Sequence, residues 1–205
     1  MKHYPSITKE IRHDIDIYAF DKLDGSNIRA EWNSKKGFYK FGTRSTLIDE
    51  KSEPFGMAIP LVKNKYEAEL TKIFQANKWT EVVCFFELYG KNSFAGQHIF
   101  TEPLDVVLLD VSPFKKGILP PTQFVNLFGH LDIPKILYHG KVTTELFDLI
   151  KQSTLPNMTF EGCVCKGESD TKANPPIMFK IKSRAWLDKL KAYCNGNESL
   201  FDKLS

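Results

Sequence analysis

The residues best suited to chemistry lie in one short run, residues 21–27 (DKLDGSN). A lysine amine attacks only after losing its proton, and its ordinary pKa of about 10.4 leaves very little free amine at neutral pH. Burial or neighbouring positive charge lowers that pKa. Lys22 is therefore a candidate nucleophile if the fold gathers cations around it. The alternative is a plain β-hairpin, in which Asp24 and Gly25 form the turn and Lys22 is a solvated charge.

Two glutamates occupy unusual positions. Glu87 lies inside the apolar run at residues 82–90 (VVCFFELYG). A buried carboxylate costs several kcal/mol of folding free energy unless it is paired, hydrogen-bonded or liganded. Glu87 is thus either a structural partner or a site residue. Glu161 begins another expected strand, directly before a glycine that allows close backbone approach, and it is either a site residue or a surface carboxylate.

Three cations complete the set of candidates. Lys180 and Lys182 are two residues apart in an expected strand, so their side chains share one face. They could point at phosphate groups, and their charge would then lower the pKa of Lys22. The alternative is a solvated basic face. Arg44, in a Thr-Arg-Ser turn, is a candidate anion-binding side chain or a plain surface arginine.

The apolar patterns predict the elements that must position these side chains. Strands are expected at residues 16–20, 28–32, 38–42, 82–90, 104–111, 159–166 and 177–183, and helices at 65–77, 121–131, 143–153 and 184–193. Residues 1–15 are expected to be a lead-in segment, and residues 54–60 and 168–176 to be loops. Strands and helices alternate without a regular βαβ order. The sequence therefore predicts an α+β fold with mainly antiparallel sheets in a single domain.

Bulk properties narrow the class of protein. A chain of 205 residues with 42% hydrophobic residues is long enough for one sizeable core. The net charge of +3 permits a nucleic-acid partner but does not require one. The four cysteines lack zinc-site spacing, which favours reduced structural thiols in a reducing compartment. No apolar run has the length of a signal region or a membrane span, so a soluble cytoplasmic protein without a membrane partner is expected.

The candidate residues form an ordered series that resembles the motifs of the covalent nucleotidyltransferases, the superfamily of ATP- and NAD-dependent ligases and mRNA capping enzymes. Residues 22–27 resemble motif I (Lys-x-Asp-Gly-x-Asn), and residues 86–90 resemble motif III. Residues 161–164 are similar to motif IV (Glu-Gly-x-Val), and residues 180–182 to motif V (Lys-x-Lys). The resemblance runs from about Asp16 to Lys191. Around motifs IV and V the chain looks most like the T4 RNA ligase 2-type RNA ligases.

This resemblance implies an ATP-grasp-like nucleotidyltransferase domain of antiparallel sheets flanked by helices, with ATP between the sheets. It implies that Lys22 attacks the α-phosphate to form lysyl-AMP, that AMP moves to an RNA 5′-phosphate, and that a 3′-OH displaces it. The implied catalytic residues are Lys22, Lys180 and Lys182. The implied nucleotide-binding residues are Asp21, Lys22, Asn27, Arg44, Glu87, Leu109, Glu161, Lys180 and Lys182. Leu109 stands where the family usually has an aromatic residue stacked on adenine. Glu161 and Glu87 would hold Mg²⁺ or Mn²⁺, since hard oxygen ligands suit such ions.

The resemblance also bears on domains and rivals. The chain stops soon after Lys182, so residues 1–205 are expected to be the adenylyltransferase domain alone, without an OB-fold or other C-terminal domain. Grip on the RNA would then come from its own surface or from an accessory protein or domain. Three alternatives remain open: a minimal ATP-dependent DNA ligase, a guanylyltransferase, and a nucleotide- or RNA-binding module that has lost ligation.

Overall fold

The computed structural model describes residues 3–13, 15–90, 103–169 and 175–205. Within these residues the chain forms nine strands and five helices. The strands are β1 (Asp16–Asp21), β2 (Gly25–Asn33), β3 (Gly37–Gly42), β4 (Leu47–Ile48), β5 (Glu81–Tyr89), β6 (Asp105–Pro113), β7 (Ile136–Lys141), β8 (Gly162–Gly167) and β9 (Ile177–Lys182). The helices are α1 (Ala58–Ala76), α2 (Pro121–Phe128), α3 (Thr144–Lys151), α4 (Arg184–Cys194) and α5 (Glu198–Leu204).

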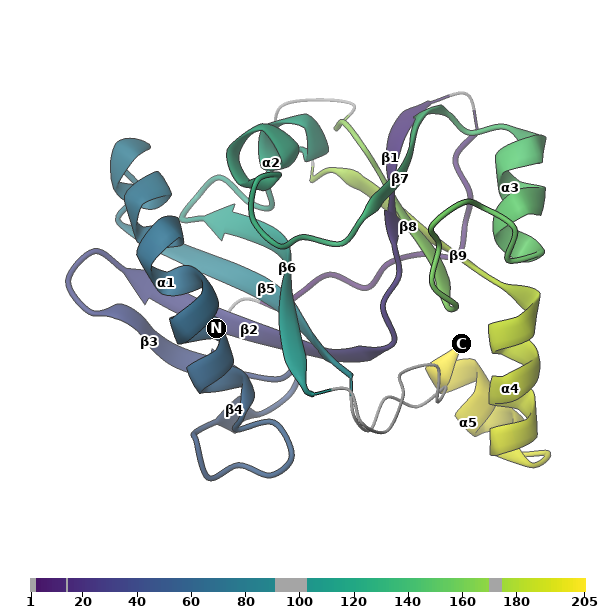
Figure 1. Ribbon diagram of the computed structural model, residues 1–205, viewed down its shortest axis with the longest axis horizontal. Helices are drawn as coiled ribbons and strands as arrows, with labels where there is room; N and C mark the ends of the chain where they lie inside the picture. The colour runs from purple at the N-terminus through teal and green to yellow at the C-terminus, as the bar shows by residue number, and fades with distance from the viewer. Residues whose placement is uncertain (1–2, 14, 91–102, 170–174) are drawn as a thin grey trace.

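The strands form two antiparallel sheets, which confirms the α+β prediction. The larger sheet has the order β4-β3-β2-β5-β6, and the smaller has the order β7-β1-β8-β9. Figure 1 shows the two sheets side by side, with α1 against the larger sheet and α3 and α4 at the opposite end of the molecule. Each sheet therefore has its own helical cover, and the two sheets meet in the middle of the chain's fold.

The hairpin alternative for residues 21–27 is wrong. β1 pairs with β7 and β8, whereas β2 pairs with β3 and β5. Residues 22–24 therefore cross from one sheet to the other instead of turning back along the same sheet. Gly25 opens β2 because a Cβ there would overlap the carbonyl group of Leu88 on β5.

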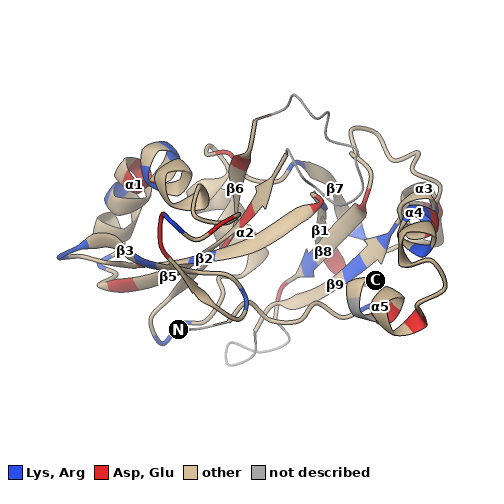
Figure 2. Ribbon diagram, turned by 90° about the horizontal axis from the view of Figure 1, so that it is seen from below, with Lys and Arg blue, Asp and Glu red and all other residues tan. Residues whose placement is uncertain are grey.

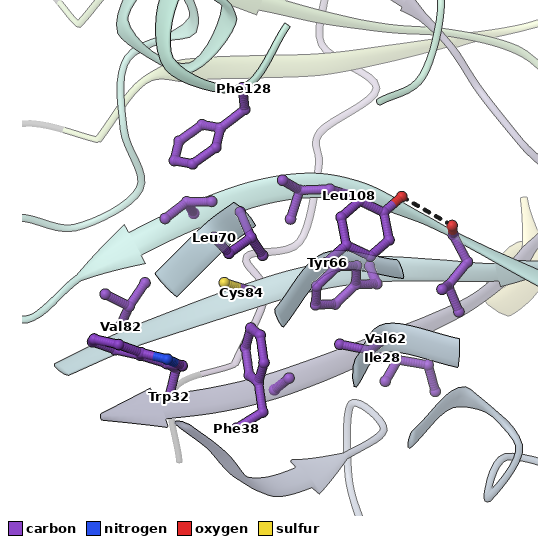
Figure 3. Close-up of a cluster of buried hydrophobic side chains, with 14 of the residues drawn as sticks. Ile28, Trp32, Phe38, Val62, Tyr66, Leu70, Val82, Cys84, Leu108 and Phe128 are labelled. Carbon is purple, nitrogen blue, oxygen red and sulfur yellow. Dashed lines mark hydrogen bonds between the residues drawn. The ribbon is translucent and has the colours of Figure 1, made fainter. Parts of the chain in front are cut away.

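The larger sheet carries the main hydrophobic core, which is rich in aromatic residues (Figure 3). The rings of Trp32 and Phe74 lie 5.0 Å apart, and those of Tyr66 and Phe86 lie 5.2 Å apart. The polar atoms in this core are satisfied: Trp32 donates to the Thr71 hydroxyl at 2.9 Å, and Tyr66 donates to the Val106 carbonyl oxygen at 3.0 Å. The larger sheet is thus rigid enough to hold one side of a site.

The differences from the predicted elements have simple causes. Helix α1 begins at Ala58 because Pro60 fits the first turn of a helix, where no intrahelical N–H bond is lost. The strand β7 shows no apolar alternation, so its sequence gave no signal. The strand β4 and the helix α5 were also missed, because both are very short. The remaining expected strands and helices are present, with ends shifted by a few residues.

Lysine and arginine occur at both ends of the molecule (Figure 2). At the end where the smaller sheet lies, they are found on β9 and α4. On β9, Phe179 and Ile181 enter the smaller hydrophobic core while Lys180 and Lys182 take the other face, as predicted from their spacing. That other face, and the segment that crosses between the sheets, form the candidate site.

Candidate active site

The centre of the site is a carboxylate held between two lysines. Lys22 Nζ lies 2.8 Å from Glu161 Oε1, and Lys182 Nζ lies 2.9 Å from the same oxygen. Glu161 is only 4% exposed, so these charges meet with little solvent screening. The structure therefore brings together three residues that are widely separated in the sequence.

The backbone around Gly162 fixes this arrangement. The Lys22 N–H donates to the Gly162 carbonyl oxygen at 2.9 Å, and the Ser183 N–H donates to the Glu161 carbonyl oxygen at 3.0 Å. Gly162 has a φ of +134°, and a Cβ there would overlap the Ile181 carbonyl group. Only glycine fits such a position without strain. The crossing segment is thus bound directly to the start of β8, and the residue before β8 is bound to the residue that follows β9.

A cavity of about 260 Å³ lies beside Lys22. The predicted site residues that line it are Asp21, Lys22, Asn27, Arg44, Glu87, Leu109 and Lys180. Glu161 and Lys182 do not line it: Glu161 forms an ion pair with Lys22, and Lys182 forms one with Glu161. All nine predicted residues therefore lie at one place: seven line the cavity, and Glu161 and Lys182 lie next to it.

The electrostatic prediction for Lys22 is wrong in sign. Burial by itself would lower the pKa of Lys22, but the carboxylates of Glu161 and Glu87 outweigh it, and the pKa is raised. Lysine neighbours do not decide the balance, because Glu161 is in direct contact with the ammonium group. In this arrangement Lys22 is a protonated lysine that is paired with Glu161.

The two lysines of β9 have lowered pKa values instead. Burial lowers the pKa of Lys182 to about 8, opposed by Glu161 and assisted by Lys22. Its ammonium group donates to the Leu204 carbonyl oxygen at 3.1 Å and lies 3.6 Å from the centroid of the Trp186 ring. Burial, Lys22 and Lys9 together lower the pKa of Lys180. The positive charges at this site therefore lower the pKa values of the two lysines of β9, and not that of Lys22.

Glu87 and Asp21 differ in what surrounds their carboxyl groups. Burial raises the pKa of Glu87 to about 8, although Lys22 opposes the shift. Burial also raises the pKa of Asp21, but its Oδ1 accepts from the Thr159 N–H at 3.0 Å and from the Thr159 hydroxyl at 3.1 Å. The side chain of Asp21 is thus used within the protein, where it joins β1 to the residues before Glu161.

Asn27 has a polar atom with no partner among the described residues. Its Nδ2 donates to the Phe86 carbonyl oxygen at 3.4 Å, while its buried Oδ1 accepts no hydrogen bond there. A buried acceptor without a partner is costly to leave unpaired. Because Asn27 lines the cavity, a hydroxyl or amino group of a ligand would satisfy this oxygen.

A divalent cation fits this donor set on chemical grounds. Among the described residues no group of three or more His, Cys, Asp or Glu side chains is close enough to hold a metal ion. Mg²⁺, however, is commonly held by one or two carboxylates together with substrate phosphates and water. Glu161 and Glu87, whose charges both act on Lys22, match that pattern. They do not form a dedicated cage for an ion without a nucleotide.

Three residues at the site were missed by the sequence reasoning: Tyr4, Asp110 and Lys166. Tyr4 and Lys166 line the cavity, and Asp110 contacts both of them. Asp110 carried a detectable signal, since it is a carboxylate in an apolar strand just as Glu87 is. Tyr4 carried none, because a single aromatic residue near the start of a chain has no pattern around it.

No protein-family profile and no curated protein sequence matches this chain. Solved structures do match it. A Naegleria gruberi RNA ligase with pyrophosphate aligns with a TM-score of 0.64 and 16% identity, covering 88% of this chain and 53% of that one. An archaeal ATP-dependent RNA ligase aligns with a TM-score of 0.64 and 16% identity, covering 95% and 52%. A Naegleria gruberi RNA ligase mutant with AMP and Mn aligns with a TM-score of 0.63 and 15% identity, covering 91% and 59%.

The chain has the fold of ATP-dependent RNA ligases. At these identities the likeness establishes the fold and not the activity. The chain spans about half the length of the ligases that it matches. No helix in the described part of the chain has both the length and the apolar character that crossing a membrane requires.

Proposed function

We propose that this protein is an ATP-dependent RNA ligase that joins 3′-OH and 5′-phosphate ends through a lysyl-AMP intermediate. The observation that carries the proposal is the contact of Lys22 with Glu161, and of Glu161 with Lys182, beside a cavity on this fold. A half-buried lysine held between two sheets, with cations and carboxylates around it, is costly for stability. Nucleotidyl transfer gives each of these groups a use.

Lys22 is the proposed nucleophile. Its nitrogen forms a bond to the α-phosphorus of ATP while the bond from that phosphorus to the bridging oxygen breaks, releasing pyrophosphate. The ammonium proton, which Glu161 holds at 2.8 Å in this structure, must pass to solvent before the attack. Phosphoryl transfer depends mainly on positioning and on neutralising the phosphate oxygens. Lys180, which lines the cavity, supplies such a charge.

Glu161 and Glu87 are the proposed ligands of Mg²⁺ or Mn²⁺, which would neutralise phosphate charge when bound. Both carboxylates raise the pKa of Lys22 while they face it alone. Turning them toward a cation removes that influence, so that burial lowers the pKa of Lys22. Lys182 keeps Glu161 in place from the side away from the cavity. The same carboxylates would thus hold Lys22 protonated at rest and release it for attack.

The remaining lining residues bind the nucleotide in this proposal. The unpaired Oδ1 of Asn27 accepts from a ribose hydroxyl, and Arg44 faces the phosphates or the incoming RNA end. Leu109 packs on the base where other family members use an aromatic ring. The carboxylate of Asp21 accepts hydrogen bonds from Thr159, so Asp21 borders the nucleotide without bonding to it through that group.

The proposal also assigns the domain organisation, the type of ligase and its substrate. Residues 1–205 would act as one adenylyltransferase domain of the T4 RNA ligase 2 type, with RNA as the substrate. The cations on α4 and β9 support a nucleic-acid partner on that side. Further grip on the RNA could come from an accessory protein or domain.

The first experiment is labelling with ATP that carries the label on its α-phosphate. In the presence of Mg²⁺ we expect a protein-bound AMP adduct that is labile in acid and stable in base. Lys22→Ala should abolish it. Lys72→Ala, which removes a lysine from an exposed ion pair with Glu69 on α1, is the matched control and should label normally. An adduct that persists in Lys22→Ala would refute the nucleophile, and ATP binding without any adduct would favour a binding module.

The second experiment separates the rival enzymes. Nicked duplexes with RNA or DNA on the 3′-OH side distinguish an RNA ligase from a minimal DNA ligase. Labelled GTP in place of ATP tests guanylyl transfer. Sealing of RNA-ended nicks with ATP is the expected outcome, and exclusive sealing of DNA-ended nicks would overturn the choice of substrate.

A further inference from the structure

The ammonium group of Lys182 is enclosed by groups from three different segments. Its Nζ lies 2.9 Å from Glu161 Oε1, donates to the Leu204 carbonyl oxygen at 3.1 Å and lies 3.6 Å from the centroid of the Trp186 ring. Lys182 is 7% exposed and Trp186 is 3% exposed. A charge that is buried this far costs free energy unless nearby groups compensate for the lost water. A carboxylate, a carbonyl group and a ring face supply that compensation here.

The start of helix α4 places the Trp186 ring. Ser183 is the N-cap of this helix, and its hydroxyl accepts from the Trp186 N–H at 3.1 Å and donates to the Phe160 carbonyl oxygen at 2.7 Å. The Ser183 N–H donates in turn to the Glu161 carbonyl oxygen at 3.0 Å. The first turn of α4 is therefore bonded to the backbone of the same residue whose carboxylate contacts Lys182.

Helix α5 is held so that its last turn presents the Leu204 carbonyl group to the ammonium group. Ser205, the next residue, is 5% exposed, and its hydroxyl accepts from Lys9 Nζ at 2.7 Å. Phe201 of α5 packs against the small buried cluster that contains Trp186. The ring of α4 and the carbonyl group of α5 thus belong to one packed unit beside the end of β9.

The two lysines that contact Glu161 share one of its two oxygens. Lys22 Nζ and Lys182 Nζ lie 2.8 Å and 2.9 Å from Oε1. A carboxylate offers about four acceptor positions on its two oxygens, so neither lysine uses those of Oε2. Without Lys182, Glu161 would keep one lysine contact and could rotate about its side-chain bonds. The orientation of Glu161 therefore depends on a lysine whose own direction is set by a ring and a helix end.

We propose that Trp186 is a positioning residue of the active site, which acts through Lys182 to fix the carboxylate of Glu161. The inference rests on the proposed nucleotidyl transfer, since Glu161 is a proposed metal ligand there. The face of an aromatic ring attracts an ammonium group, and an aliphatic side chain does not. The ring therefore keeps Lys182 directed at Glu161. Groups that orient a metal ligand without touching the metal typically contribute roughly 10- to 100-fold to affinity or activity.

Two substitutions at this position separate the ring from its bulk. Trp186→Leu removes the ring face and keeps an apolar side chain, and we expect the rate of adduct formation per folded molecule to fall by roughly 10- to 100-fold. Trp186→Phe keeps a ring, and we expect its rate to stay within about threefold of the unmodified protein. A normal rate in Trp186→Leu would overturn the inference. Equal losses in both variants would also overturn it, since the bulk and not the ring would then matter.

Trp79→Leu is the matched control. Trp79 is 7% exposed in the core of the larger sheet, and Lys116 Nζ lies 5.7 Å from the centroid of its ring. The same substitution there removes a buried ring and a lysine contact away from the site. Urea unfolding measures the folded fraction, which should form the adduct at the normal rate. A loss of rate as large as that of Trp186→Leu would overturn the inference, because any missing ring would then disturb the site.

Fluorination of the ring tests the contact almost without changing its shape, so it decides even if Trp186→Leu does not fold. Tryptophans with one to four fluorine atoms, placed at position 186 by nonsense suppression, weaken the attraction for a cation step by step. The rate should fall with each added fluorine, and a constant rate would overturn the inference. A double-mutant cycle tests the route: in a Lys182→Met background, Trp186→Leu should change the rate by less than about threefold. Effects that multiply independently would contradict a route through Lys182.

The reactivity of the Lys182 amine distinguishes the two proposals, because it requires no nucleotide. Reductive methylation followed by peptide mass spectrometry measures how fast Lys182 is modified relative to Lys191, an exposed lysine on α4. The ratio should rise by about 10-fold in Trp186→Leu and with the tetrafluorinated ring. A raised ratio without any adduct in the unmodified protein would refute the ligase and sustain the placement of Lys182. An adduct that forms equally fast in every folded variant would refute the role of Trp186 and sustain nucleotidyl transfer.

Discussion

The two sheets of this protein use their buried faces differently. The larger sheet, with α1 and α2, encloses a core of aromatic and aliphatic side chains in which the rings of Trp32, Tyr66 and Phe74 are almost fully enclosed. The smaller sheet buries groups such as Ile17 and Cys165 on one face. On its other face Phe20 joins the core of the larger sheet, and Lys166 and Lys180 line the cavity.

The difference follows from the pleat and from where the sheets meet. Alternate residues of β9 point to opposite faces, so a strand with Phe179 and Ile181 in a core can present Lys180 to a cleft and Lys182 to Glu161 beside it. The larger sheet contributes few charged groups to that cleft, among them Glu87 and Arg44. Substitutions in the larger sheet should therefore change stability, and substitutions on the charged face of the smaller sheet should change chemistry.

Phe74→Ala should show the largest effect on stability. Phe74 is fully buried on α1 and touches Trp32 and Phe128, well away from the charged cleft. Removing a buried ring costs roughly 3–5 kcal/mol, because the transfer term and the cavity term add. Urea unfolding measures this loss, and the labelling assay should give a normal rate per folded molecule.

The matched control for this variant is Phe114→Ala. Phe114 is 60% exposed, so its removal should change the free energy of unfolding by about 0.5 kcal/mol or less. If Phe74→Ala were to reduce the labelling rate of the folded fraction strongly, the division of labour between the two sheets would be wrong.

Lys180→Met should show the reverse pattern. Lys180 lines the cavity, and the charges of Lys22 and Lys9 lower its pKa together with burial, so it contributes little to folding as a cation. We expect the free energy of unfolding to change by about 1 kcal/mol or less. Loss of a preorganised positive group at a transferring phosphate typically costs about 10²–10³-fold in rate. Single-turnover adduct formation and urea unfolding measure the two quantities.

Lys191→Met, on the exposed face of α4, is the control for the removal of a lysine. It should leave both quantities near those of the unmodified protein. A Lys180→Met variant that unfolds while the folded fraction labels at the normal rate would mean that this face of β9 is structural.

Sequence patterns predicted the parts of the site that depend on local geometry. The two-residue spacing of Lys180 and Lys182 fixed their common face, and the isolated Glu87 in an apolar strand indicated a site residue. The strand before Lys22 was equally evident from its composition. Each of these inferences needs only the pleat of a single strand or the cost of burying one charge.

What could not be predicted depends on which strands pair. Nothing in the sequence indicates that β1 and β2 belong to different sheets, so the segment between them resembles a hairpin turn. The pKa of Lys22 was assigned the wrong direction because its contact with Glu161 arises only when β8 joins β1. The pairing of Asp110 with Tyr4 and Lys166 requires three distant segments to meet. Long-range pairing of this kind leaves no periodic signal in any one segment.

Glu87→Gln tests the one acidic residue that the larger sheet contributes from β5 to the cleft, and its effect should depend on pH. Burial raises the pKa of Glu87 from 4.5 to about 8, so between these values the folded protein keeps a proton that the unfolded chain has lost. The free energy of unfolding therefore falls as pH rises from about 4.5 to about 8.

Glutamine cannot lose that proton, so the free energy of unfolding of Glu87→Gln should change less with pH across this range. At pH 8 the variant should exceed the unmodified protein by up to about 4 kcal/mol, because one pKa unit corresponds to about 1.4 kcal/mol, and its Tm should be higher accordingly. The difference should shrink toward zero as the pH falls to about 4.5. Glu81→Gln, at the exposed start of the same strand, should give a curve parallel to that of the unmodified protein. If Glu87→Gln is parallel as well, Glu87 is ionised at neutral pH, and both sheets then bring full charges to the cleft.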